Sequence, residues 1–128
     1  MTEESRAFLD LSASDLAGAA RDLGAGDPRL AVARAYYAAF HAAQAALVSE
    51  GRAARSHAGT RSLFSELFVQ SGRVDARLGR TLSVLMDLRQ QADYHVGEFI
   101  SGPEGEKALA DAASFVETIE ALLSERPA

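Results

Sequence analysis

Apolar residues recur every three or four positions along nearly the whole chain, which is the period of one face of an α-helix. The first such face carries Leu9, Ala13, Leu16, Ala20 and Leu23. No segment shows the strict alternation of apolar and polar residues that is typical of a half-buried strand. This pattern predicts an all-α fold.

Glycine, proline and capping residues divide the pattern into about five helices. The expected helices run from about Thr2 to Leu23, from Pro28 to about Ser49, from near Ser56 to Ser71, from about Val74 to His95, and from the capping box at Ser101 to about Leu123. Helices joined by such short connections predict an up-and-down antiparallel bundle. A length of 128 residues predicts that the bundle is one domain, spanning residues 1–128.

Several kinds of site are excluded by the residues that the chain lacks. It has no cysteine, which removes disulfides, thiolate zinc sites and cysteine nucleophiles. Its three histidines, His41, His57 and His95, fall on different expected helices without metal-binding spacing. Glycine-rich nucleotide loops and serine hydrolase motifs are absent as well. We therefore expect neither a metal site nor a cofactor.

Hydropathy and charge indicate the cellular compartment of the protein and whether it binds membranes or nucleic acids. No run of roughly eighteen apolar residues occurs, and the first twenty residues contain acids rather than a signal-peptide core. These features predict a cytoplasmic protein that does not cross a membrane. The net charge of −5 argues against a surface that coats nucleic acid, but it leaves a small local RNA site open.

Twelve of the thirteen basic residues are arginine, and six of these lie in residues 52–61 and 73–80. The planar guanidinium group suits the geometry of phosphate, so these stretches indicate a basic rim beside a site. A GC-rich coding sequence would produce the same excess of arginine. The sequence alone leaves both explanations open.

Residues 89–95 are the most informative segment for function. Arg89 interrupts an apolar stripe that otherwise consists of Leu78, Leu82, Leu85, Ala92 and Val96. An arginine in such a stripe needs a partner, so Arg89 is either half of an ion pair with Asp93 at i, i+4 or part of a site. His95 lies about 240° around an ideal helix from Arg89, so the two side chains meet only if the helix loosens or two copies of the chain face each other.

A second polar ridge lies on the expected second helix. It carries Arg34, Tyr37, His41 and Gln44, at spacings of three, four and three, beside the core stripe of that helix. The ridge is either a hydrogen-bonding network that reaches Asp93 or Tyr94, or the second wall of a polar pocket. Ser56-His57 with Gly59 is more typical of a helix start than of a functional site, although it indicates a site weakly.

Three segments resemble, in order, motifs of the HEPN-domain family. Residues 33–43, ARAYYAAFHAA, resemble its "RAYYAxFHAA" helix; residues 56–59 resemble its "SHxG" segment; and residues 89–94 resemble its "RxxADY" segment. The likeness extends from about Asp15 to Leu122. It implies an up-and-down, HEPN-like helical bundle that is commonly a homodimer and is often encoded beside a minimal nucleotidyltransferase. In a dimer, the apolar stripe around Arg89 could be the subunit interface.

Many members of that family are metal-independent ribonucleases with an R-x(4–6)-H motif, and the two copies of the motif meet across the dimer. In several toxin–antitoxin pairs the HEPN protein is the toxin and the nucleotidyltransferase is the antitoxin. The resemblance implies that Arg89 binds the scissile phosphate of an RNA substrate and that His95 moves protons. The supporting or binding residues would be Asp93, Tyr94, Arg34, Tyr37, His41 and His57.

This chain departs from the toxin pattern at two positions. Gln90 follows the arginine where toxin members usually carry Asn, Asp or His, and Tyr94 precedes the histidine instead of following it. These departures keep an alternative open, in which the chain is a non-catalytic module that binds the nucleotidyltransferase or a nucleotide. A plain dimerisation bundle is the third possibility.

Overall fold

Five α-helices and one π-helical turn contain most of the residues that the computed structural model describes, which are 1–94 and 99–124. The elements are α1 (Glu3–Gly24), α2 (Pro28–Ser49), α3 (His57–Phe64), η1 (Ser65–Val69), α4 (Ala76–Tyr94) and α5 (Gly102–Ser124). These ranges contain no strand. The predicted all-α bundle is confirmed, whereas His95 lies outside the described residues.

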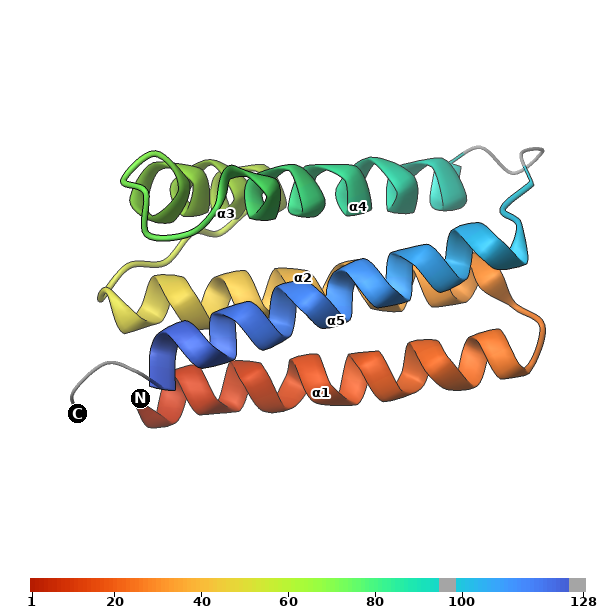
Figure 1. Cartoon of the computed structure of the whole chain (residues 1–128), viewed down its shortest axis with the longest axis horizontal. Coiled ribbons are helices and arrows are strands. Elements are labelled where there is room, and N and C mark those ends of the chain that lie inside the picture. Colours follow the sequence, from red (N-terminus) through yellow and green to blue (C-terminus); the bar gives the residue numbers. More distant parts are fainter. Residues whose placement is uncertain (95–98, 125–128) are drawn as a thin grey trace.

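The central helix of the bundle is α2, which packs against α1, α3, α4 and α5. The long helices run up and down, so the start of α1 and the end of α5 lie at the same end of the molecule (Figure 1). Short alanine side chains on α2 allow this close packing, and eight of them are buried: Ala31, Ala35, Ala38, Ala39, Ala42, Ala43, Ala45 and Ala46. Two buried hydroxyls on α1, Ser5 and Ser12, donate hydrogen bonds to carbonyl oxygens of α2.

Local capping chemistry sets most of the helix starts, as expected. The side chain of Asp27 accepts a hydrogen bond from the backbone N–H of Leu30, and Pro28 occupies the first turn. Ser101 and Glu104 form the predicted capping box, with the Ser101 hydroxyl accepting from the Glu104 N–H and the carboxylate accepting from the Ser101 N–H. Gly51 follows α2 with a φ of +69°, which suits glycine after a helix end.

The third expected helix differs from the structure. Its α-helical part ends at Phe64, and the chain continues through the π-helical turn η1, in which the N–H of Gln70 donates to the oxygen of Ser65. Phe64 and Phe68 are fully buried and stack with their ring centroids 5.4 Å apart. The sequence shows the apolar positions of this segment, but the wider turn depends on how the rings pack into the bundle.

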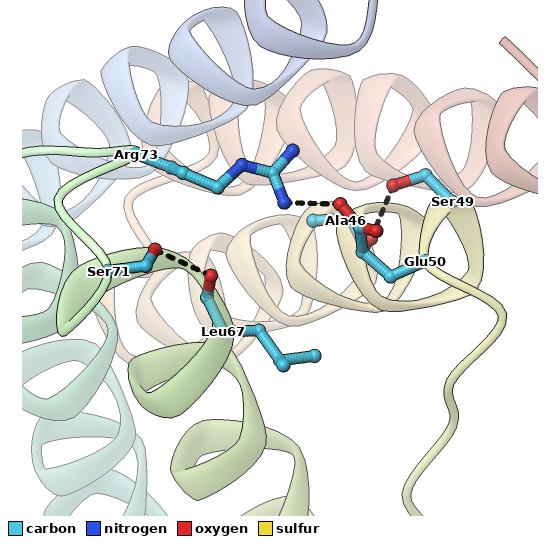
Figure 2. A network of polar contacts seen from close by, with 6 residues as sticks. All are labelled: Ala46, Ser49, Glu50, Leu67, Ser71 and Arg73. Carbon is cyan, nitrogen blue, oxygen red and sulfur yellow. Dashed lines mark hydrogen bonds and ion pairs between the residues drawn. The ribbon is translucent and has the colours of Figure 1, made fainter.

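Polar contacts hold the connection from η1 to α4. Arg73 of this connection pairs with Glu50 at the end of α2, and the hydroxyl of Ser71 donates to the oxygen of Leu67 in η1 (Figure 2). The guanidinium carbon of Arg73 also lies 4.4 Å from the centroid of the Phe68 ring. With the connection held in this way, α4 starts at Ala76, two residues after the expected start.

Within the described ranges, no helix combines the length and the apolar character needed to cross a bilayer.

Candidate functional site

Arg89 lies near the end of α4 and faces two tyrosines of α2. Its guanidinium carbon is 5.3 Å from the centroid of the Tyr37 ring and 5.6 Å from that of the Tyr36 ring. At these distances the negative faces of the rings attract the cation. The Arg89 side chain is 20% exposed, so it lies at the edge of the core with one side open to solvent.

The ion pair expected within this segment is present. Nε of Arg89 lies 2.9 Å from Oδ2 of Asp93, one helical turn later. The Nε–H group is not aligned with an acceptor, so the contact is a charge–charge contact rather than a directed hydrogen bond. Asp93 therefore balances the charge of Arg89 without saturating its hydrogen-bond donors.

His57, the first residue of α3, joins the same cluster. Its Nδ1 lies 2.6 Å from the phenolic oxygen of Tyr36, and its ring stacks on Phe40 with centroids 4.3 Å apart. The Ser56 hydroxyl caps α3 by accepting from the Gly59 N–H, and a Cβ at position 59 would lie 2.8 Å from that hydroxyl. The Ser-His-x-Gly spacing thus forms a tight cap that places the imidazole against α2.

The apolar spacing along α2 predicts a core position for Tyr36, but the structure places its hydroxyl in the cluster. The Tyr36 side chain is almost completely buried. A buried phenol needs a hydrogen-bond partner, so a tyrosine in the apolar stripe of a helix is a sequence signal for such a polar role. The identity of the partner depends on the packing of α3 against α2.

Burial sets the protonation states of this pair. It raises the pKa of Tyr36 to about 12, against the opposing charge of Arg89. Burial also lowers the pKa of His57, and the positive charges of Arg89 and His41 lower it further. At neutral pH the phenol is therefore protonated and the imidazole is neutral. His57 thus adds no second positive charge beside Arg89.

The lowered pKa of His57 predicts a pH dependence of stability. A histidine that is harder to protonate in the folded state stabilises that state above the unfolded pKa of about 6.5, and the contribution is lost as the pH falls through the lower folded-state pKa. We expect the melting temperature to fall as the pH is lowered from 7.5 to 5.5, and to fall less in His57→Gln. An equal fall in melting temperature in the two proteins would contradict this assignment.

The second polar ridge divides between two neighbours. Tyr37 faces Arg89, whereas Arg34 and His41 pair with carboxylates of α1. Nε of Arg34 lies 2.7 Å from Oδ2 of Asp22, and Nδ1 of His41 lies 2.7 Å from Oδ2 of Asp15. The sequence predicts that this ridge reaches Asp93 or Tyr94 of α4. Among the described contacts, Arg34 and His41 instead pair with these two acids of α1.

The aliphatic part of Arg34 crosses Gly18, where an added Cβ would lie 2.9 Å from Cδ of the arginine.

Of the predicted site residues, the structure gathers Arg89, Asp93, Tyr37 and His57 in one cluster. It places Arg34 and His41 against α1.

The apolar stripe that leads into Arg89 packs inside the chain. Leu82, Leu85 and Ala92 are buried among the other helices, so they do not form a surface for a second subunit. The exposed large apolar residues nearby are Tyr94 and Phe99, with 74% and 82% of their surface accessible.

Across residues 1–94 and 99–124, no group of three or more histidine or acidic side chains is placed to hold a metal ion. The chemistry that the described cluster offers is that of one cation, one carboxylate, two phenols and a neutral imidazole.

Comparisons with known proteins agree with this architecture. The model of the HEPN domain matches residues 5–122. "Putative toxin MJ0605" of Methanocaldococcus jannaschii is 33% identical over 123 residues, covering 96% of this chain and 91% of that protein. A UPF0332 protein of Archaeoglobus fulgidus is 40% identical over 83 residues, covering 65% of this chain and 66% of that protein.

Among solved structures, TT1696 from Thermus thermophilus superposes with a TM-score of 0.80, over 94% of this chain and 99% of that one. Its sequence is 23% identical, so this similarity shows the fold alone.

Proposed function

The chain belongs to the HEPN domain family, and from this membership we propose that it is a toxin-type ribonuclease controlled by a nucleotidyltransferase antitoxin. The toxin designation in the name of the Methanocaldococcus jannaschii relative supports the toxin role. The ribonuclease activity rests on the chemistry of Arg89 and on the histidine six residues after it.

The position of Arg89 is the observation that carries the proposal. Two aromatic rings and Asp93 hold the guanidinium in one place, while one side of it stays open to solvent. A fixed cation stabilises charge that develops on a phosphate at little cost in reorganisation. The donors of Arg89 that Asp93 does not occupy are the groups that would bind the scissile phosphate.

The proposed reaction uses groups of the protein alone. His95 takes the proton from the ribose 2′-hydroxyl, and the resulting oxygen attacks the adjacent phosphorus. The bond from phosphorus to the 5′-oxygen breaks, and that oxygen takes from His95 the proton that the histidine removed from the 2′-hydroxyl, which leaves the imidazole neutral again. The products are a 2′,3′-cyclic phosphate and a 5′-hydroxyl end, while Arg89 stabilises the negative charge on the phosphoryl oxygens.

A dimer is part of this proposal. On one straight ideal helix, a residue six positions after Arg89 lies about 240° around the axis, which is about 120° from Arg89 the shorter way, so the two side chains would not converge within a single copy. Tyr94 and Phe99 expose large apolar surfaces on either side of residues 95–98, and exposed apolar surface of this kind often marks a protein interface. The proposed dimer has two copies meeting there, with Arg89 of one copy working with His95 of the other.

One observation favours a second candidate function. Asp93 already neutralises Arg89, which is what a purely structural arginine requires. In that case the chain would be a non-catalytic module that docks the nucleotidyltransferase or binds a nucleotide.

Purified protein and RNA of mixed sequence, incubated in an excess of EDTA, test the primary proposal. We expect cleavage that leaves cyclic phosphate ends, and we expect the proposed nucleotidyltransferase antitoxin to suppress it. Intact RNA together with tight binding to the nucleotidyltransferase would instead establish the interaction module.

A further inference from the structure

A groove with a volume of about 610 Å³ runs between α3 and η1 on one side and the first half of α4 on the other. This volume is within the range of roughly 300–1,000 Å³ that is usual for ligand sites. Its floor and walls include the apolar side chains of Phe64, Val69 and Val84. Gly79 allows the two walls to approach closely, because a Cβ there would lie 3.2 Å from a methyl group of Val69.

The groove is positively charged although the chain is acidic. No aspartate or glutamate lines it, whereas Arg61 and Arg80 do. In the described part of the chain, neither of these arginines has an ion-pair partner, while Arg77 and Arg89 of the same α4 are paired with nearby aspartates. Two guanidinium groups are therefore available to an anion.

Three serines add hydroxyl groups to the lining. Elsewhere, Thr81 in α4 and Ser71 in the turn after η1 donate to the carbonyl oxygen of the residue four positions earlier. Among the hydrogen bonds of the described residues, the hydroxyls of Ser62, Ser65 and Ser83 make no such bond. They are free to donate to phosphate oxygens.

The groove adjoins the Arg89 cluster through α3. Arg61 lies one helical turn after His57, so the two side chains share a face of that helix. The wall opposite α4 contains the π-helical turn η1, and such turns occur frequently at functional sites.

We propose that this groove binds the sugar–phosphate backbone of single-stranded RNA and guides the strand toward Arg89. The inference rests on the ribonuclease activity proposed above. The arginines and the hydroxyls suit the phosphates, and Val69 and Val84 offer apolar contact to unpaired bases. The overall negative charge limits binding to this local site, so a short strand fits the molecule better than a long duplex.

The test uses the full chain and a fluorescent single-stranded RNA of about twelve nucleotides whose 2′-oxygens are methylated, so that it binds without being cleaved. Fluorescence anisotropy then reports the Kd. We expect the double variant Arg61→Gln, Arg80→Gln to raise the Kd at least tenfold. The slope of log Kd against log salt should fall by roughly 1.4, which is 0.7 for each of two lost contacts with a single strand.

The matched control is Arg55→Gln, Arg77→Gln, which removes the same charge outside the groove. We expect a change in Kd of less than threefold for this control. Equal weakening by both double variants would overturn the groove as a site, and so would the absence of RNA binding by the wild-type protein. Equal competition by polyglutamate of matched charge would overturn RNA as the ligand in favour of an acidic protein.

Cleavage of unmodified RNA separates this inference from the function on which it rests. If the groove variant binds RNA more weakly but the wild-type protein does not cleave RNA, the RNA-binding groove is supported and the ribonuclease activity is rejected. If the groove variant binds RNA as well as the wild type, and the wild type cleaves RNA through Arg89, the groove is rejected and the ribonuclease activity is supported.

Discussion

Arg89→Ala is expected to lower the rate of RNA cleavage about 100- to 1,000-fold, the usual cost of removing one donor to a transition-state oxyanion. The protein should stay folded, because Arg89 lies at the edge of the core and Asp93 is exposed enough to be hydrated once it is unpaired. The measurement is the initial rate on a labelled RNA, with a melting curve for each protein.

Arg77→Ala is the control for this variant, since it removes an exposed, paired arginine from the same helix. We expect its cleavage rate to match that of the wild type. Arg89→Lys should fall between the wild type and Arg89→Ala, because lysine keeps the charge but loses the planar pair of donors. Full activity in a folded Arg89→Ala protein would show that Arg89 takes no part in the reaction.

A mixture of Arg89→Ala and His95→Ala protomers distinguishes a shared site from one that is built within a single chain. If Arg89 of one copy works with His95 of the other, each mixed dimer keeps one intact pair and regains part of the activity. If both residues act within one copy, every pair in the mixture is broken. The rate after mixing thus tests the dimer independently of any measurement of mass.

The parts of the fold that depend on local chemistry could be predicted from the sequence. The Asp27–Pro28 start of α2 and the capping box of α5 involve only residues within one turn of each other, so their spacing was enough. The π-helical turn after Phe64 could not be predicted, because its apolar pattern is compatible with a continuous helix. The turn lies where buried rings from α3, η1 and α5 come together, which are contacts that the local spacing does not contain.

The same distinction applies to the candidate site. The pairing of Arg89 with Asp93 is fixed by one turn of helix and was predicted. The bond between Tyr36 and His57 joins residues that are 21 positions apart, so it depends on the packing of α3 against α2. The functional role of His95 remains a prediction from the spacing of the motif.

Phe64→Ala is expected to lower the free energy of unfolding by about 3–5 kcal/mol, the range for removing a buried aromatic ring. Phe64 is fully buried, and its ring centroid lies 5.4 Å from that of Phe68 and 5.5 Å from that of Phe115. Its removal therefore leaves a cavity where α3, η1 and α5 meet. Equilibrium unfolding in urea measures the loss.

Leu11→Ala on α1 is the control for this truncation, because Leu11 is 48% exposed and should cost less than about 1 kcal/mol. The comparison also bears on the groove, since Phe64 supports its floor. A small loss in Phe64→Ala, similar to that of Leu11→Ala, would show that α3 and η1 are not packed tightly against α5 in solution. The walls of the groove would then lack the rigid support that a defined RNA site requires.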